Sequence, residues 1–124
     1  MFDKIYAQND VVGLALNAYA VRNEVIQHNI ANNDTPGYKK RIVEFEEAFS
    51  AALENSKRTG TINPKKIEPK VRMIHENYSF RLDGNNVDTE LEMVDLYKNS
   101  VKYDVLASAV INNYRKINLV ATGR

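Results

Sequence analysis

Residues 89–121 read TELEMVDLYKNSVKYDVLASAVINNYRKINLVA, the longest regular pattern in the chain. Apolar, tyrosine and small side chains recur in it at alternating steps of three and four, which is typical of a coiled-coil seam. At 1.5 Å per residue such a helix is about 45 Å long, more than a domain of this size needs for its own core. The predicted seam consists of Met93, Leu96, Ser100, Tyr103, Ala107, Val110, Tyr114, Ile117 and Ala121.

A second apolar row runs beside this seam, so one partner helix would not cover the whole apolar face. We therefore expect the last helix to face two neighbours. The second row consists of Val94, Tyr97, Val101, Val105 and Ile111.

The last helix is expected to begin just after residues 83–86 (DGNN), which are typical of a turn. Two residues are candidates for the N-cap of this helix: Thr89, in a capping box with Glu92, or Asp88. Carboxylates are favoured at the positive end of the helix dipole. Four of them stand here, namely Asp88, Glu90, Glu92 and Asp95.

The first segment, Phe2 to Asn32, predicts a second long amphipathic helix. Asn23 fills one gap in its seam, and Pro36 and Gly37 predict its end near Asn32 to Asp34. The apolar seam is formed by Val12, Leu16, Tyr19, Ile26 and Ile30, and a row beside it by Leu14, Ala18, Val21 and Val25. We expect this second row, like that of the last helix, to pack against a neighbouring subunit.

The middle of the chain has shorter patterns. Tyr38 to Val43 is expected to be extended, Phe45 to Leu53 to form a short helix, and 57–69 to break regular structure. Segments 71–74 and 78–82 are compatible with a short β-hairpin. The predicted fold is mainly α, with the two terminal helices paired as a coiled coil. It is one domain with an N-terminal helix in 1–35, a middle region in 36–86 and a C-terminal helix in 87–124.

Composition narrows the classes of function. The chain has 124 residues and a net charge of +1, without the basic excess typical of nucleic-acid binding. It has no cysteine, which excludes disulfides and thiolate metal sites. No apolar run reaches the 18 or more residues of a membrane span. We see no cleavable signal peptide in Met1 to Asp10, and expect any export to use another route.

The residues do not predict an enzyme, a cofactor or a metal site. His28 and His75 stand apart from other ligand-type residues, and no nucleotide-binding or nucleophile motif is present. Glu44, Glu46 and Glu47 are best explained as a solvated face. A basic group in the middle region is either a solvated loop or a docking surface for an acidic subunit: Lys65, Lys66, Lys70 and Arg72.

Asparagines cluster where the first helix is expected to end. Asn29, Asn32 and Asn33 can bond freed backbone carbonyls there, residues 35–37 force a turn, and Tyr38 can fold back on the helix end. From physics alone this is either an ordinary C-cap or an element with a further role.

Residues 28–39, HNIANNDTPGYK, resemble a signature of the bacterial flagellar axial proteins, the family of rod, hook and hook-associated proteins. Residues 84–103 are similar to the proximal rod members of that family, whereas 57–80 matches nothing in it. Where other rod and hook proteins tend to carry Arg-x-Tyr-Glu-x-Asn, this chain has Lys-Tyr-Asp-Val at 102–105. The signature positions are Asn29, Ile30, Ala31, Asn32, Thr35, Pro36, Gly37, Tyr38 and Lys39.

The resemblance implies a structural subunit of the rod that crosses the periplasm and transmits torque. It implies export through the flagellar type III apparatus without cleavage, and partners that are copies of the chain, other rod subunits, the basal ring and the rod-base adaptor. Direct membrane insertion is not expected. The residues expected to carry assembly are Val87, Glu92, Met93, Leu96, Tyr103, Ala107, Val110, Tyr114 and Ile117.

A runner-up hypothesis is a helical adaptor or chaperone-like module that binds another protein's amphipathic helix. It explains the two helices but not the signature. Under the rod hypothesis, exposed apolar rows are an association hazard, so we expect loosely helical ends in the isolated monomer.

Overall fold

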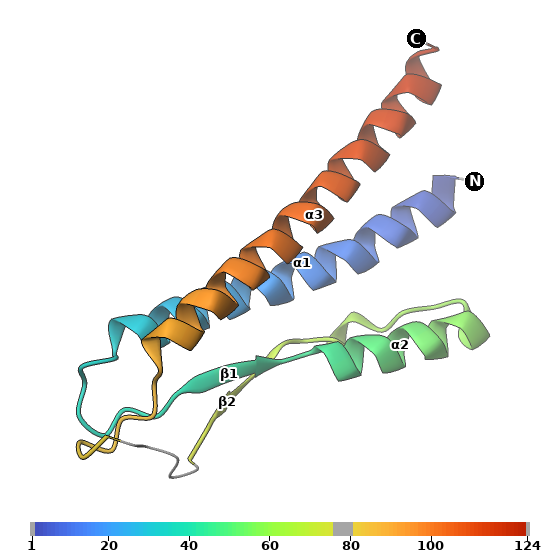
Figure 1. The fold of residues 1–124 in the computed structure, drawn as a ribbon. Helices are drawn as coiled ribbons and strands as arrows, with labels where there is room; N and C mark the ends of the chain where they lie inside the picture. Colours follow the sequence, from blue (N-terminus) through green and yellow to red (C-terminus); the bar gives the residue numbers. More distant parts are fainter. Residues whose placement is uncertain (1, 76–80, 124) are drawn as a thin grey trace.

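The computed structural model describes residues 2–75 and 81–123 and has a mainly helical fold with a small antiparallel sheet (Figure 1). This confirms the predicted fold class. The elements in chain order are α1 (Phe2–Ala31), β1 (Arg41–Glu44), α2 (Glu46–Thr59), the 3-10 turn η1 (Pro64–Lys66), β2 (Lys70–Met73) and α3 (Thr89–Thr122).

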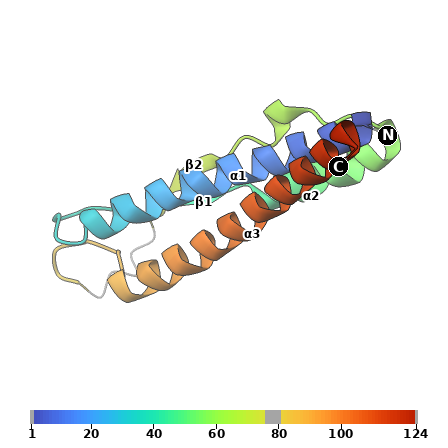
Figure 2. The same cartoon turned by 90° about the horizontal axis from the view of Figure 1, so that it is seen from above.

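The two terminal helices, α1 and α3, run antiparallel and side by side, with both chain termini at the same end (Figures 1 and 2). At the opposite end, α1 leads into β1 and α3 emerges from the loop at 81–88. This end is closed by the connecting segments, and it is where the signature residues lie. Across the described residues, no helix has the length and apolar content that crossing a membrane requires.

The seam on α3 has the predicted period, but every second position in it is occupied by the residue before the predicted one. Met93 and Tyr114, predicted to lie in the seam, are 58% and 52% exposed. Polar side chains that find partners on α1 take the neighbouring positions, and this explains the displacement. The buried and half-buried series is Glu92, Leu96, Asn99, Tyr103, Leu106, Val110, Asn113 and Ile117, with Ser100 and Ala107 half-buried beside it.

The second apolar row of α1 is covered by the middle of the same chain. Ala18 is fully buried against Val43 and Phe45, and Val21 and Val25 pack around this cluster. The expectation that this row faces a neighbouring subunit is therefore wrong for α1. The extended residues 41–45 and α2 lie against α1 and cover the row, so α1 packs against both α3 and the middle region of the chain.

Arg22 of α1 fixes the start of α2. Its guanidinium donates to the Val43 carbonyl at 2.7 Å, pairs with the Glu46 carboxylate, and lies 4.8 Å from the centre of the Phe45 ring. The hydrogen bond from Arg22 lowers the pKa of Glu46 below its ordinary value of 4.5. Burial raises the pKa of Tyr19, which packs edge-to-face on Phe45 with ring centres 5.0 Å apart.

The helix α2 is longer than predicted. It continues through 57–59, which was expected to be irregular, and ends at Gly60. Gly60 has a φ of 72°, a left-handed conformation that glycine adopts without a steric penalty. Its backbone N–H donates to the Ser56 carbonyl at 2.7 Å, which closes the helix.

The strand β2 pairs with β1. The register is antiparallel and sets Arg41 against Met73 and Glu44 against Lys70. The extended stretch before α2, which the hairpin prediction did not consider, is therefore a partner of this strand; the predicted pairing of 71–74 with 78–82 involves residues 78–80, which lie outside the described residues. Of the basic group, Arg72 forms an ion pair with Glu44 at 2.8 Å, and the lysines are exposed.

Asp88, not Thr89, is the N-cap of α3. Its Oδ1 accepts from the backbone N–H groups of Glu90 at 3.0 Å and Leu91 at 3.2 Å. The capping box of Thr89 with Glu92 does not form, because the Glu92 side chain turns inward to α1 instead.

Candidate functional site: a polar junction at the closed end of the helix pair

Asn29, in the last turn of α1, lies at the centre of the junction and is 0% exposed. Its Nδ2 donates to the Arg41 carbonyl at 2.8 Å and to the Glu92 carboxylate at 2.9 Å. Its Oδ1 accepts from the Arg41 N–H at 3.0 Å and from the Tyr38 hydroxyl at 3.1 Å. One amide thus uses both donors and both acceptor positions, and joins α1, β1 and α3.

Glu92 is a buried carboxylate, 1% exposed, in the first turn of α3. It forms an ion pair with the ammonium of Lys40, whose side chain is 24% exposed, and accepts the Asn29 hydrogen bond. A buried charge is strongly destabilising unless it is paired and hydrogen-bonded. The two partners meet that requirement only when α3, α1 and residue 40 are in place together.

Asn85, from the loop before α3, closes the end of α1. Its Nδ2 lies 2.9, 2.9 and 3.0 Å from the carbonyl oxygens of Asn32, Asn33 and Thr35. These three carbonyls lie in the turn that follows α1. Asn85, which is fully buried, supplies a donor to this turn from a segment about 50 residues away, and its Oδ1 accepts from the Val87 N–H at 2.8 Å.

Two glycines let the two loops of the junction approach each other. Gly37 and Gly84 have φ values of 70° and 76°, and a Cβ added to Gly84 would lie 3.8 Å from the Gly37 Cα. The Gly37 N–H donates to the Asp83 carbonyl at 2.8 Å, and the Lys39 ammonium donates to the Gly84 carbonyl at 2.6 Å. The turn after α1 and the turn before α3 are therefore bonded directly through their backbones.

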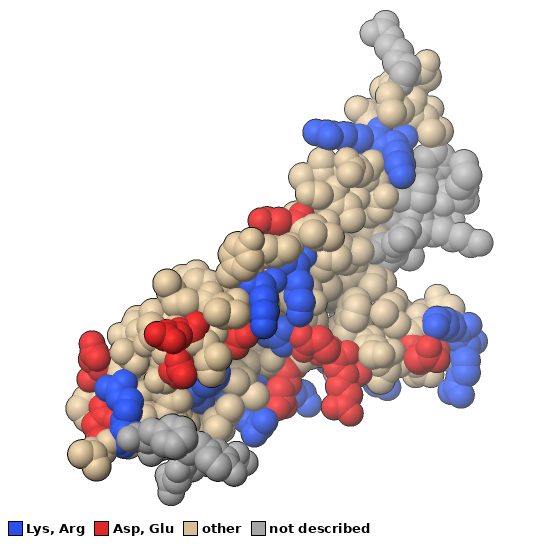
Figure 3. Space-filling view, in the orientation of Figure 1, with Lys and Arg blue, Asp and Glu red and all other residues tan. Residues whose placement is uncertain are grey.

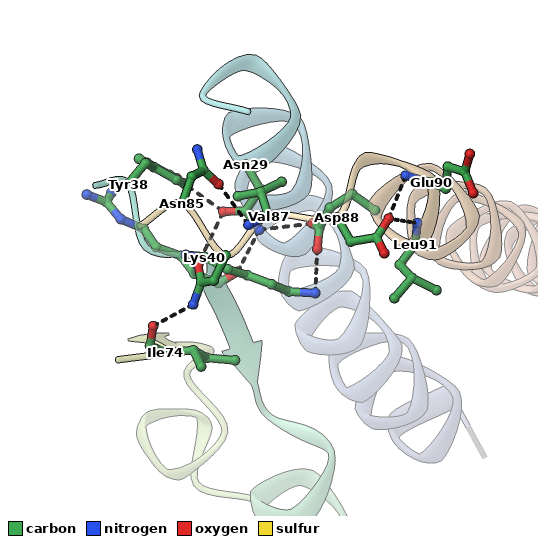
Figure 4. A network of polar contacts seen from close by, with 12 residues as sticks. Asn29, Tyr38, Lys40, Ile74, Asn85, Val87, Asp88, Glu90 and Leu91 are labelled. Carbon is green, nitrogen blue, oxygen red and sulfur yellow. Dashed lines mark hydrogen bonds and ion pairs between the residues drawn. The ribbon is translucent and has the colours of Figure 1, made fainter. Parts of the chain in front are cut away.

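Asn86 connects the junction to the sheet. Its Oδ1 accepts from the Lys40 N–H at 2.5 Å, and its Nδ2 donates to the Ile74 carbonyl at 3.0 Å (Figure 4). Arg81 adds a further link, because its guanidinium donates to the Asn33 carbonyl at 2.7 Å. Residues from five separate segments meet here.

The signature residues do not contribute equally to this junction. Asn29, Tyr38 and Lys39 bond other segments, whereas Asn32 bonds locally, donating to the His28 carbonyl at 2.8 Å and accepting from Thr35 at 3.1 Å. Gly37 shapes the turn. The side chains of Ala31 and Pro36 are exposed, and Ile30 is half-buried.

The sequence alone did not point to Lys40 or Asn85 as members of the site. Asn85 was included in a turn prediction, and Lys40 was part of a segment predicted to be extended. No pattern in the sequence distinguished Asn85, which lies two residues before Val87. Its partners lie about 50 residues away, so no local pattern shows them.

A groove of about 270 Å³ lies beside the junction, between β1 and α3. Five cationic residues line it (Arg22, Lys40, Arg41, Lys98 and Lys102) against two carboxylates (Glu92 and Asp95). This charge favours acidic side chains over basic ones. Within residues 2–75 and 81–123, no group of three or more His, Asp or Glu side chains is placed to hold a metal ion.

The residues expected to carry assembly, which lie on α3 or just before it, differ in their exposure to solvent. Leu96, Tyr103, Ala107, Val110 and Ile117 are half-buried, and Val87 and Glu92 are buried in the junction. Met93 and Tyr114 are exposed. The second apolar row is exposed throughout: Val94 48%, Tyr97 72%, Val101 43%, Val105 63% and Ile111 51%.

Comparisons with known proteins agree on one family. No protein-family model matches the chain. The chain is 30% identical over 117 residues to the flagellar basal body rod protein FlgB of Bacillus subtilis (strain 168), covering 88% of each protein. It is 30% identical to FlgB of Buchnera aphidicola subsp. Acyrthosiphon pisum, covering 99% of this chain and 100% of that one. It is 28% identical to FlgB of Escherichia coli (strain K12), covering 99% of each.

Proposed function

The chain belongs to the family of the flagellar basal body rod protein FlgB, and from this premise we propose that it is a structural subunit of the flagellar rod. It assembles in the proximal rod with other copies and other rod subunits, next to the basal ring and the rod-base adaptor. It reaches this place through the flagellar export apparatus. Its role is to carry torsion across the periplasm, with no bond made or broken.

The exposed apolar row of α3 is the observation that carries this proposal. Its five members, defined above, lie on the side of α3 away from the seam, and they include Tyr97 at 72% exposure. Figure 3 shows wide uncharged areas along α3 between small groups of charged side chains. A contiguous apolar surface of this kind marks a protein–protein contact. An open helical assembly needs such a heterologous surface on each subunit.

The junction supports a mechanical role. Asn29, Glu92 and Asn85 join α1, β1 and the start of α3 through buried hydrogen bonds and an ion pair. A load applied to one terminal helix therefore passes to the other and to the sheet at this end. We infer that the signature residues serve to hold this joint.

A deletion strain complemented with variants tests the proposal. Deletion is expected to abolish filaments and swimming with normal growth, and the unchanged chain is expected to restore both. The double variant Tyr97→Glu, Val101→Glu places two charges in the exposed row and is expected to fail in restoring them. Ser50→Glu is the control, because it adds a charge at an exposed site on α2 and leaves the row on α3 unchanged.

Two further readouts separate the outcomes. Circular dichroism of the purified double variant is expected to match the unchanged chain, since the row makes few contacts within the subunit. Isolated basal bodies are expected to contain the complementing chain. Intact filaments in the deletion strain would reject the rod and favour the helical adaptor, which would use the same row to bind one helix.

A further inference from the structure

Asparagines occupy the seam between α1 and α3 at positions where coiled coils ordinarily carry apolar side chains. Asn99 is 3% exposed, and its Nδ2 donates to Asn23 Oδ1 at 2.7 Å and to the Tyr19 carbonyl at 2.8 Å. Asn113 donates from Nδ2 to Oδ1 of Asn9, which is 6% exposed, at 3.2 Å. The two helices are thus linked by two asparagine pairs.

The spacing of these pairs defines one register. Asn99 and Asn113 are 14 residues apart on α3, and Asn9 and Asn23 are 14 residues apart on α1, which is two heptads on each helix. Leucine lies midway in both cases, so each helix reads Asn, Leu, Asn at intervals of seven. The leucines are Leu16 and Leu106.

A third polar pair sets the direction of the helices. The Asn, Leu, Asn pattern is symmetric and would also fit a parallel partner. Glu92 lies seven residues before Asn99 and bonds Asn29 at 2.9 Å. In a parallel pair Glu92 would lie level with the first turn of α1, about 40 Å along the helix from Asn29. Only the antiparallel arrangement of the two helices forms all three polar pairs.

The asparagine pairs do not maximise stability. Within the described part of the chain, neither Asn9 Nδ2 nor Asn99 Oδ1 has a hydrogen-bond partner, although both atoms are buried. A buried polar atom without a partner lowers stability, and a pair of leucines would bury more apolar surface. A polar residue at a seam position is a known means of specifying register and partner at the expense of stability.

We propose that Asn9, Asn23, Asn99 and Asn113, with the Glu92–Asn29 pair, form a recognition pattern by which α3 selects α1 over other amphipathic helices. The pattern sets one direction and one register. A slip of one heptad either way places Asn99 opposite Leu16 or Ile30, so that its amide faces an apolar side chain. The seam then rejects other amphipathic helices, and only the exposed row of α3 remains for association.

Register can be measured in the isolated full chain, and this selection holds whether or not the chain builds a rod. The chain has no cysteine, so nitroxide labels at Gln27→Cys and Ser108→Cys, both exposed and about 20 Å apart along the helix axis, report one interhelix distance without background. Trimethylamine N-oxide is added because it strengthens apolar burial. The test variant carries leucine at all four asparagines. The control carries Leu16→Ile and Leu106→Ile, which keep the pattern.

The unchanged chain and the control are expected to give one narrow distance distribution and a monomer by light scattering. The four-leucine variant is expected to have a higher Tm together with dimers, or with added label distances, because a slip of seven residues moves one label about 10 Å along the helix axis. One unshifted distance in a monomeric four-leucine variant would overturn the proposal. Several distances in the unchanged chain or in the control would overturn it as well.

Discussion

Three buried polar side chains decide how the closed end of this molecule is built. Asn29, Asn85 and Glu92 are each at most 1% exposed, and each bonds a segment distant in the sequence. The asparagine cluster predicted a helix end, and Asn29 does lie there. Its actual partners, at positions 41 and 92, are 12 and 63 residues away, so spacing could not reveal them.

The Asn85→Ala variant tests the role of Asn85 in closing the junction. It removes a donor to the turn after α1 and the acceptor of the buried Val87 N–H, and a buried donor left without a partner costs about 1–3 kcal/mol of unfolding free energy. Urea unfolding followed by circular dichroism measures the loss. Asn112→Ala, at an exposed site on α3, is expected to change the free energy by less than about 0.5 kcal/mol. Equal effects of the two variants would contradict this role of Asn85.

The Arg22–Glu46 pair predicts a dependence of stability on pH. Because the pKa of Glu46 is lowered by folding, its contribution is present above the unfolded value near 4.5 and is lost as pH falls through the folded value. The difference in Tm between the unchanged chain and Glu46→Gln is therefore expected to shrink on acidification through this range. Glu47→Gln, one residue along, is expected to show no such trend. A difference that grows on acidification would refute the assignment.

At the scale of the element, the helices have the predicted type and period, but the seam of α3 faces a different set of residues. Hydropathy favoured Met93 and Tyr114, and the structure buries Glu92 and Asn113 partly or fully instead. A hydrogen bond across the helices offsets the burial of each polar group. The period of one helix cannot reveal these hydrogen bonds, because they depend on the side chains of the partner helix.

Two valine variants on α3 separate its two faces. Val110 is half-buried in the seam, and Val105 is 63% exposed in the second row. Val110→Glu is expected to lower stability by about 1–3 kcal/mol, because it places a charge between the helices, and to abolish assembly. Val105→Glu is expected to leave the Tm nearly unchanged while weakening assembly. A normal Tm and normal motility for Val110→Glu would count against the seam.

At the scale of the whole molecule, α1 is covered on two sides and α3 on one. The middle region, in which an extended segment and a short helix were predicted, supplies β1 and α2, and these cover the second row of α1. This leaves α3 as the helix with a free apolar face. The free end of the pair carries further exposed apolar side chains, such as Leu119 at 57% and Val120 at 63%.

Limited proteolysis of the monomer tests how order varies along the helix pair. Few buried contacts and exposed backbone make a helix end open readily. Early cleavage is therefore expected near both termini, with residues 26–45 and 85–99 protected by the junction. Mass spectrometry of the fragments locates the cuts. Full protection of both termini would contradict loosely helical ends before assembly.

The sequence by itself determined the helical class, the approximate limits of both long helices and the family, because these depend on local period, caps and a contiguous signature. The tertiary structure decided which residues form the seam, which strand pairs with Lys70–Met73, and which row stays exposed. These depend on hydrogen bonds and packing between segments 12 to 104 residues apart, such as Asn29 with Arg41 and Asn113 with Asn9. Such pairings depend on where the chain returns in space, and a local pattern does not contain that information.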